Sequence, residues 1–140
     1  MANQNAETVR VTYWPGWGRC EPLRCILAAA GVPFTNNFLT AESGRSELES
    51  LRTAGILQWD QVPLVEMDGR NLVQVNAVAN YLGTRCGLLP SDAGDSYLVQ
   101  GVWASCQDAR AALLGFPFSA YPAPPSKAQF DSTRRGIMGE

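Results

Sequence analysis

The chain has 140 residues, of which 46% are hydrophobic, enough to build the core of one domain and part of a second. Its 13 acidic residues outnumber its 11 basic residues and the net charge is −2, which argues against a nucleic-acid or membrane partner. Four cysteines without a C-x-x-C pair, together with the absence of histidine, exclude most zinc sites and every Ser-His or Cys-His mechanism, so we expect no metal.

The first predicted element is a strand from Val9 to about Trp14, where apolar and polar residues alternate. A turn at Pro15–Gly18 separates it from a helix that ends at Gly31. The apolar residues of this helix recur at helical spacing: Leu23, Ile26, Leu27 and Ala30. Residues 34–39 are predicted to form a second strand, which is parallel to the first because a helix lies between them.

Residues 46–52 are predicted to form a short helix of weak periodicity, and residues 61–74 a β-hairpin. Two apolar runs flank Asp68 and Gly69, the dipeptide that best tolerates the positive φ angles of a type I′ turn. Pro63 opens the first strand of the hairpin, where its missing N–H disturbs the ladder least. We interpret this hairpin as a candidate binding edge.

A further helix should follow the hairpin, with Asn76 as its N-cap and its end before Gly87. Pro and Gly within residues 88–94 predict a linker, and a long helix with one apolar face is predicted at residues 95–114. Beyond it we expect at most one weak helix, at residues 126–134. The order β-α-β-α-β-β-α through about residue 87 predicts an α/β domain with one four-stranded mixed sheet covered by helices.

Several short motifs occur in this chain in the order and at nearly the spacings of one enzyme family: VTYW (11–14), GRCE (18–21), LAAAGV (27–32), QVP (61–63), DG (68–69) and LVQ (72–74). Over roughly residues 9–115 the chain resembles the cytosolic glutathione S-transferases, most closely the tyrosine-type branch with the alpha, mu, pi and sigma classes. The resemblance implies a thioredoxin-like, glutathione-binding domain at residues 7–89. It also implies an incomplete all-helical domain at residues 90–140, because the family continues through several more helices.

By this resemblance, Tyr13 at the end of the first strand donates its hydroxyl to the glutathione sulfur and favours thiolate over thiol. Arg19 lies near the sulfur and assists its ionisation, as a fixed cation does beside a developing anion. The other interpretation of Tyr13 is an aromatic residue at the edge of the core. Cys20 is an alternative nucleophile at the start of the first helix, where partial positive charge favours a thiolate, and its competing interpretation is a small buried cysteine.

The resemblance also makes the hairpin a clamp for glutathione. Pro63 is expected to be cis, so that the backbone N–H and C=O of Val62 pair with the cysteinyl part of glutathione like an added antiparallel strand. Arg52 and Gln61 match positions that contact the glycyl and neighbouring polar parts, and Gln74 matches one that contacts the γ-glutamyl group. A solvated helix face is the other interpretation of Arg52.

Val75 stands where most relatives have Ser or Thr, so it keeps the backbone N–H but lacks a hydroxyl for the γ-glutamyl carboxylate. Asn76 is a candidate to compensate. Asp108 in the long helix matches a carboxylate that, in the alpha class, reaches the γ-glutamyl amine across a dimer, and its other interpretation is a solvated aspartate. The aromatic candidates for an electrophile site are Trp14, Trp17 and Phe116.

Together these residues predict a glutathione S-transferase that conjugates glutathione to small electrophilic apolar compounds, with glutathione as cosubstrate and no bound cofactor. The resemblance implies a homodimer. The alternatives are a non-catalytic binding or structural module, which Val75 and the short C-terminal region favour, and a glutathione-dependent isomerase. The polar N-terminus and the lack of about 18 successive apolar residues predict no signal peptide and no membrane span, so we expect a cytoplasmic protein with free thiols.

Overall fold

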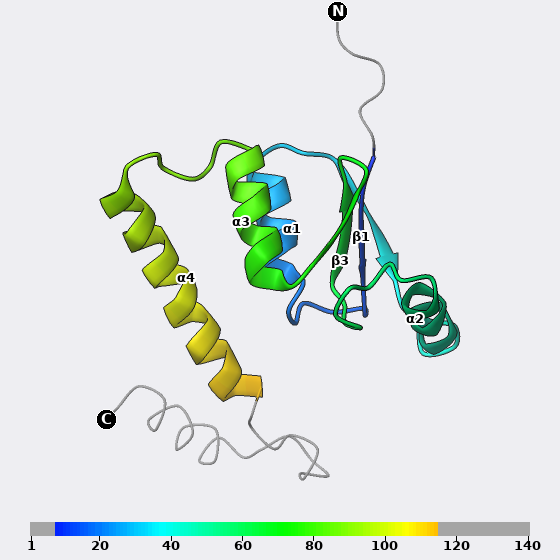
Figure 1. Ribbon diagram of the computed structural model, residues 1–140. Coiled ribbons are helices and arrows are strands. Elements are labelled where there is room, and N and C mark those ends of the chain that lie inside the picture. Colours follow the sequence, from blue (N-terminus) through cyan, green and yellow to red (C-terminus); the bar gives the residue numbers. More distant parts are fainter. Residues whose placement is uncertain (1–7, 115–140) are drawn as a thin grey trace, which may run out of the picture. The chain divides into compact units, whose positions relative to one another are not determined.

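The computed structural model of the chain describes residues 8–114, and Figure 1 shows their helices and strands. The elements are β1 (Val9–Tyr13), α1 (Glu21–Ala29), β2 (Phe34–Phe38), α2 (Gly44–Thr53), β3 (Leu64–Met67), β4 (Arg70–Val73), α3 (Val75–Arg85) and α4 (Ala93–Leu114). This order confirms the predicted β-α-β-α-β-β-α succession and the long helix after it. The chain divides after Leu89 into two compact units, of which the first holds the sheet and the second holds α4. The weak helix predicted at 126–134 lies outside the described residues.

The four strands form one mixed sheet in the order β2-β1-β3-β4. β1 is parallel to β2, whereas β3 is antiparallel to both β1 and β4. The parallel pair follows from the helix between the two strands, and the antiparallel pair from the tight hairpin turn. Tyr13 is the last residue of β1 and lies opposite Phe38 of β2, so the Tyr13 side chain stands at the end of a central strand.

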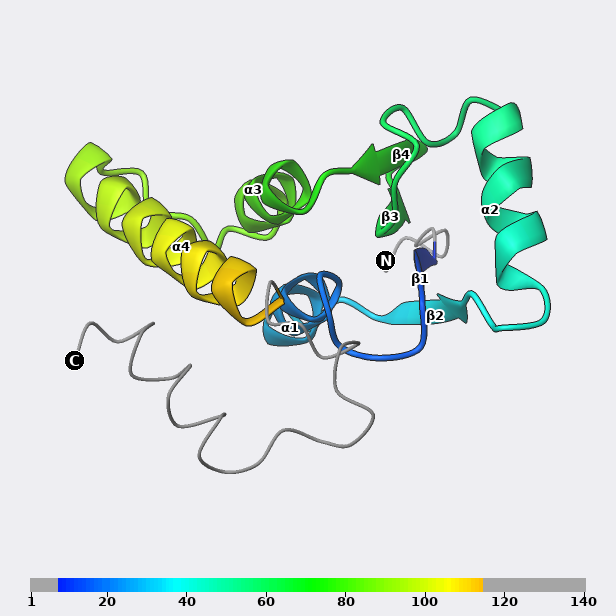
Figure 2. The same cartoon turned by 90° about the horizontal axis from the view of Figure 1, so that it is seen from below.

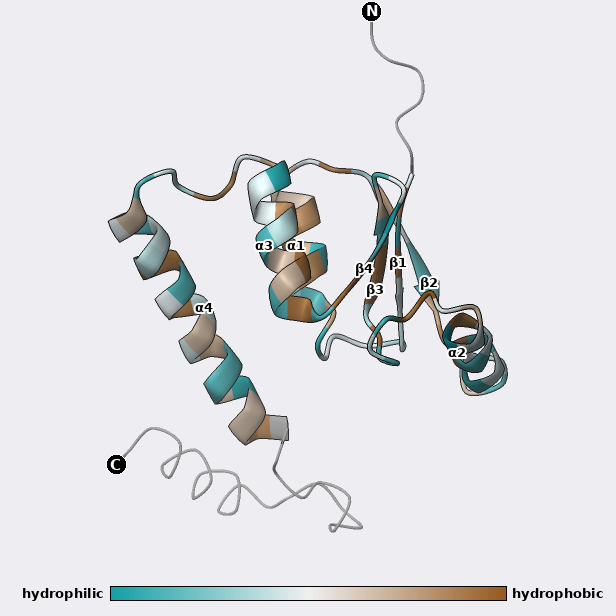
Figure 3. Cartoon of the chain, in the orientation of Figure 1, coloured by the Kyte–Doolittle hydropathy of each residue, from teal (hydrophilic) through white to brown (hydrophobic). Residues whose placement is uncertain are grey.

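Helices cover both faces of this sheet, as Figure 2 shows: α1 and α3 lie side by side on one face and α2 lies on the other. The side chains of α1 and α3 that turn inward are fully or almost fully buried: Leu23, Leu27, Val78 and Leu82. Figure 3 shows mostly polar colours on α2 and apolar ones on α1 and β3. The larger part of the core therefore lies between the sheet and the α1–α3 pair.

A smaller core on the α2 face holds the segment that leads into the hairpin. Its buried members are Leu57, Leu64 and Val73, and the partly buried residues packed against it are Leu48, Leu51, Ile56 and Val62. Polar contacts add to this attachment. Asn37 of β2 donates to Thr12 Oγ1 at 3.3 Å and to Glu47 Oε1 of α2 at 2.5 Å. α2 is thus fixed to the sheet by both apolar packing and hydrogen bonds.

The start of α3 differs from the prediction, because Gln74 and not Asn76 is its N-cap. Gln74 has φ 72° and its carbonyl accepts the Val78 N–H at 2.9 Å, so this single residue joins the end of β4 to the start of the helix. The prediction of Asn76 as the cap was wrong because it relied on residue preference alone. α4 also begins slightly earlier than predicted, since Asp92 Oδ1 accepts the N–H groups of its first turn.

The turn of the hairpin confirms the predicted type I′ geometry, with φ 52° at Asp68 and 67° at Gly69. It is also tied to α3. Asp68 Oδ2 accepts the Tyr81 hydroxyl at 2.9 Å and Arg85 Nε at 3.0 Å. This cluster joins the tip of the hairpin to the helix that follows it.

We expect the cluster to make the stability of the first unit depend on pH in acid. The hydrogen bonds from Tyr81 and then Arg85 hold the pKa of Asp68 below its usual value. The folded state therefore binds fewer protons than the unfolded state. The contribution is present above about pH 4 and is lost as the pH falls through the folded-state pKa.

Urea midpoints at about pH 7 and about pH 3 test this expectation. The urea midpoint of Asp68→Asn should fall less between about pH 7 and about pH 3 than that of the wild-type chain, because the amide does not titrate. Glu42→Gln, a change at an exposed carboxylate outside the cluster, is the matched control. An unchanged pH dependence in Asp68→Asn would refute the assignment.

Candidate functional site

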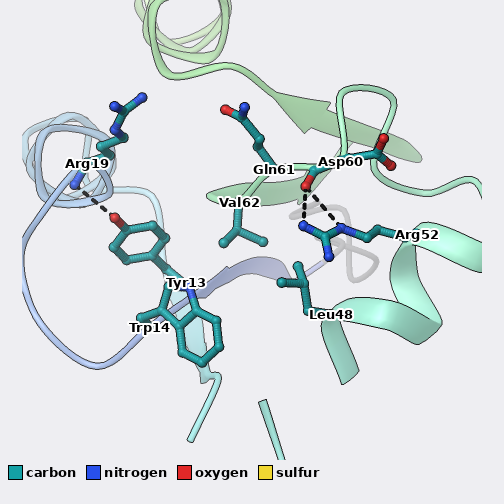
Figure 4. Close-up of a pocket in the computed structure, with 8 residues that line it drawn as sticks. All are labelled: Tyr13, Trp14, Arg19, Leu48, Arg52, Asp60, Gln61 and Val62. Atoms are coloured by element: carbon teal, nitrogen blue, oxygen red, sulfur yellow. Dashed lines mark hydrogen bonds between the residues drawn. The ribbon is translucent and has the colours of Figure 1, made fainter. Parts of the chain in front are cut away.

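A pocket of about 380 Å³ opens where the end of β1 meets α2 and the segment before β3. It is lined by Tyr13, Trp14, Arg19, Leu48, Arg52, Asp60, Gln61 and Val62. Figure 4 shows Tyr13 and Arg19 on one side, Leu48 and Arg52 of α2 on the other, and Val62 between them. Segments far apart in the sequence thus contribute polar and apolar groups to one pocket.

Tyr13 reaches the pocket because it ends β1 and is only half-buried. Its hydroxyl oxygen accepts a hydrogen bond from the backbone N–H of Arg19 at 3.2 Å. Figure 4 shows the Arg19 guanidinium extending away from this contact. A phenol that accepts through its oxygen keeps its own hydrogen for a ligand. The structure therefore brings the two predicted catalytic residues together, with the Arg19 backbone as the contacting group.

Arg24, which is not among the predicted site residues, holds the loop that carries Arg19. Its Nη1 donates to the Gly16 carbonyl at 2.8 Å, and its Nε donates to Asn36 Oδ1 of β2 at 2.8 Å. The guanidinium also lies 5.5 Å from the centre of the Phe38 ring. The signal in the sequence was the spacing of Glu21 and Arg24, which lie three residues apart on the helix and form an ion pair at 3.0 Å.

Arg52 fixes the opposite wall of the pocket. Its Nε and Nη2 both donate to the Asp60 carbonyl, at 3.1 Å and 2.9 Å, and its Nη1 lies 3.6 Å from Glu49 Oε2. The fork of the guanidinium suits such paired donation. Arg52 is therefore not a merely solvated side chain, because it connects α2 to the segment that carries Gln61.

The peptide bond between Val62 and Pro63 is cis, as the resemblance implied. Val62 is partly buried and lines the pocket, and β3 begins just after Pro63. In the described part of the chain, neither the N–H nor the C=O of Val62 takes part in a backbone hydrogen bond. This backbone is thus available to an extended ligand.

The other predicted site residues lie outside this pocket. Gln74 is exposed at the N-cap of α3, and the Val75 side chain is buried at the first position of that helix. Asp108 is exposed in α4, within the second unit. Of the aromatic candidates, Trp14 lines the pocket and Trp17 is 79% exposed elsewhere in the loop, while Phe116 lies outside the described residues.

Cys20 is fully buried at the N-cap of α1. Burial raises the pKa of its thiol to about 11, since removal from water penalises the thiolate more than the nearby Arg24 favours it. The thiol is therefore protonated at neutral pH. These facts favour a small buried cysteine over the alternative nucleophile. No group of side chains within residues 8–114 is arranged to hold a metal ion.

Residues 9–84 match the protein family described as Glutathione S-transferase, N-terminal domain. The chain belongs to the glutathione S-transferase family. Its relatives include the rat protein Glutathione S-transferase alpha-5, which is 41% identical over 106 residues, or 76% of this chain and 47% of that protein. The chicken Glutathione S-transferase 3 is 40% identical over 76% of this chain and 45% of its own length. The chain thus spans about half the length of the curated relatives that it matches.

Solved structures share the fold of this chain. The glutathione S-transferase from Ascaris lumbricoides has a TM-score of 0.73 and 26% identity, over 94% of this chain and 64% of its own. A structure named prostaglandin synthase D of Nilaparvata lugens has a TM-score of 0.67 and 25% identity, over 95% of this chain and 61% of its own. The predicted family and the thioredoxin-like fold are therefore confirmed. Within residues 8–114, no helix has the length and hydrophobicity of a membrane span.

Proposed function

We propose that this chain is a glutathione transferase that joins the sulfur of glutathione to an electrophilic carbon of a small apolar compound. The thiolate supplies the electron pair of the new C–S bond, and the leaving group departs with the pair of the bond that breaks. The observation that carries the proposal is the Tyr13 hydroxyl, which lines the pocket and is held by the Arg19 N–H.

The energy that this hydroxyl must provide is modest. A free thiol titrates near 8.5, so making it mostly ionised at pH 7 requires a depression of about two units, or roughly 2.7 kcal/mol. One hydrogen bond to a charged acceptor contributes about 1.5–3 kcal/mol. Tyr13 can therefore carry most of the stabilisation, with positioning of the two reactants lowering the barrier further.

The rest of the pocket suits the peptide part of glutathione. In this proposal the backbone of Val62 pairs with the cysteinyl group, as a strand added to a free edge does. Arg52 and Gln61 on the same wall bind the glycyl end, where a cation suits a carboxylate. Gln74 and the N–H of Val75, at the start of α3, bind the γ-glutamyl end.

The function is tested with the full chain on immobilised glutathione and with a chromogenic aryl halide. Retention that soluble glutathione releases but dithiothreitol does not, together with formation of the thioether product, is the expected result. Tyr13→Phe should retain binding and lose most of the turnover. Binding without turnover would support the non-catalytic module instead, and failure of both would refute any glutathione-dependent role.

A glutathione-dependent isomerase is the second candidate. One of the similar solved structures is named a prostaglandin synthase, a name that does not describe conjugation. The two activities differ in their consumption of glutathione, because isomerisation returns the thiol. Thiol titration during turnover of a screened substrate therefore separates them.

The proposal extends to the whole chain. We assign glutathione binding to residues 7–89 and an all-helical segment to residues 90–140, with Asp108 reaching the γ-glutamyl amine of a partner subunit in a homodimer. We also place the protein in the cytoplasm. Its cysteines are all free, the state that a reducing compartment maintains. Sedimentation at micromolar concentration tests the dimer.

Val75 should limit the affinity for glutathione. A threonine in its place would add one hydroxyl where the γ-glutamyl carboxylate binds, and a charge-assisted bond contributes about 1.5–3 kcal/mol. Val75→Thr is expected to bind glutathione roughly ten- to a hundred-fold more tightly by isothermal titration calorimetry. Val73→Thr is the matched control, since both side chains are 8% exposed and Val73 packs into the α2-face core. Equal affinity in Val75→Thr and wild type would show that the missing hydroxyl is irrelevant.

A further inference from the structure

Gly18 lies in the loop between β1 and α1, directly before the N–H that donates to Tyr13. Its φ is +44°, in the left-handed region that favours glycine. A Cβ on Gly18 would lie 2.9 Å from the Tyr13 hydroxyl oxygen, 3.2 Å from Cε1 and 3.5 Å from Cζ of the same ring. The phenol therefore occupies the space that any other side chain at this position would need.

This close approach is not shared by glycines of similar backbone conformation. Gly31 has φ +66°, and a Cβ placed there would meet nothing within 4 Å. Position 31 therefore requires glycine only for its backbone conformation, whereas position 18 also requires it because a Cβ would collide with Tyr13.

The Tyr13 backbone cannot easily give way to a side chain at residue 18. Its carbonyl accepts the Leu39 N–H at 3.0 Å, and its Cα is paired with Phe38 across the sheet. Either the ring must rotate or the loop must move. We expect either movement to disturb the contact between the hydroxyl and the Arg19 N–H.

We propose that Gly18 is a positioning residue for the conjugation reaction: its missing side chain lets the Tyr13 hydroxyl lie against the loop and accept the Arg19 N–H. The hydroxyl hydrogen is then left to point at the glutathione sulfur. Because consecutive hydrogen bonds strengthen one another, the Arg19 N–H also makes the phenol a better donor. This inference rests on the proposed function.

Two substitutions distinguish the need for space beside Tyr13 from the need for a positive φ at residue 18. Gly18→Ala and Gly18→Asn both introduce a Cβ, but asparagine tolerates positive φ far better than alanine. Both should lower kcat/KM roughly ten- to a hundred-fold through a misplaced hydroxyl, with KM for glutathione little changed. The ionisation of bound glutathione, followed by thiolate absorbance in the binary complex, should move to higher pH. Gly31→Ala is the control for backbone strain. It should leave kcat/KM and the ionisation of bound glutathione unchanged.

A second measurement does not depend on activity. In the ¹⁵N-labelled full chain, the Arg19 amide resonance and its hydrogen exchange report the bond to Tyr13. Gly18→Ala and Gly18→Asn should move this resonance in the direction seen in Tyr13→Phe and speed up its exchange. If the wild-type chain forms no conjugate, the proposed function fails, and the resonance still decides whether Gly18 positions the hydroxyl.

Three results would overturn the inference. The first is wild-type kcat/KM in Gly18→Asn, which would make backbone conformation the whole requirement. The second is an Arg19 amide that is unmoved in both variants, and the third is an equal loss in Gly31→Ala. In support, Gly18→Ala combined with Tyr13→Phe should be no slower than Tyr13→Phe alone, because both changes remove the same interaction.

Discussion

Tyr13→Phe should reduce kcat/KM for conjugation at pH 7 by roughly ten- to a hundred-fold, because it removes a hydrogen bond of about 1.5–3 kcal/mol to the thiolate. The phenyl ring of the variant still fills the same place at the end of β1, so the affinity for glutathione should change little. The activity lost at pH 7 should partly return as the pH approaches the ordinary titration range of a free thiol, near 8.5. Initial rates between about pH 6 and pH 9 with saturating glutathione measure this.

Tyr97→Phe is the matched control, since Tyr97 is 75% exposed on α4 and the substitution removes the same hydroxyl. Its pH profile should coincide with that of the wild-type chain. An undiminished rate in Tyr13→Phe would remove the phenol from the mechanism. A rate loss that stays constant at all pH values would mean that Tyr13 acts through something other than ionisation of the sulfur.

Leu64→Ala should lower the free energy of unfolding by about 2–5 kcal/mol, the range for a fully buried leucine that leaves a cavity. The Leu64 side chain is 0% exposed and belongs to the core on the α2 face. A domain of this size has a total stability of about 5–15 kcal/mol, so the urea midpoint should fall steeply. Leu64 directly follows Pro63. A less tightly packed core on the α2 face should therefore also weaken the proposed binding of glutathione to Val62.

Leu88→Ala provides the comparison within the same unit, since Leu88 is 46% exposed. A surface change of this kind usually alters stability by no more than about 0.5 kcal/mol. Similar midpoints for the two variants would refute the role of Leu64 in the core. Calorimetric titration with glutathione below the unfolding transition would show whether loss of packing reaches the pocket.

The elements of the first unit could be predicted well because they depend on local periodicity. Alternation from Val9 to Tyr13 and the spacing of the apolar residues in α1 repeat often enough to identify a strand and a helix. The type I′ turn was predictable because Asp68 and Gly69 tolerate positive φ.

The site was predictable only in part. Tyr13 and Arg19 were found through the family resemblance, which implied an Arg19 cation near the glutathione sulfur. The hydrogen bond from the Arg19 backbone N–H to the Tyr13 hydroxyl was not predicted. A contact made by a backbone group does not depend on the side chain, so the residue type does not reveal it. The same holds for the Asp60 carbonyl that receives Arg52.

The sequence was sufficient for the succession of strands and helices, the hairpin turn and the family, since all of these depend on residue patterns along the chain. Only the tertiary structure decided that Gln74 begins α3, that Cys20 is a buried thiol and that Gly18 lies against the Tyr13 hydroxyl. The physical reason is that burial and close approach are set by how separate segments pack, so residues with strong local preferences can still be placed by their neighbours in space.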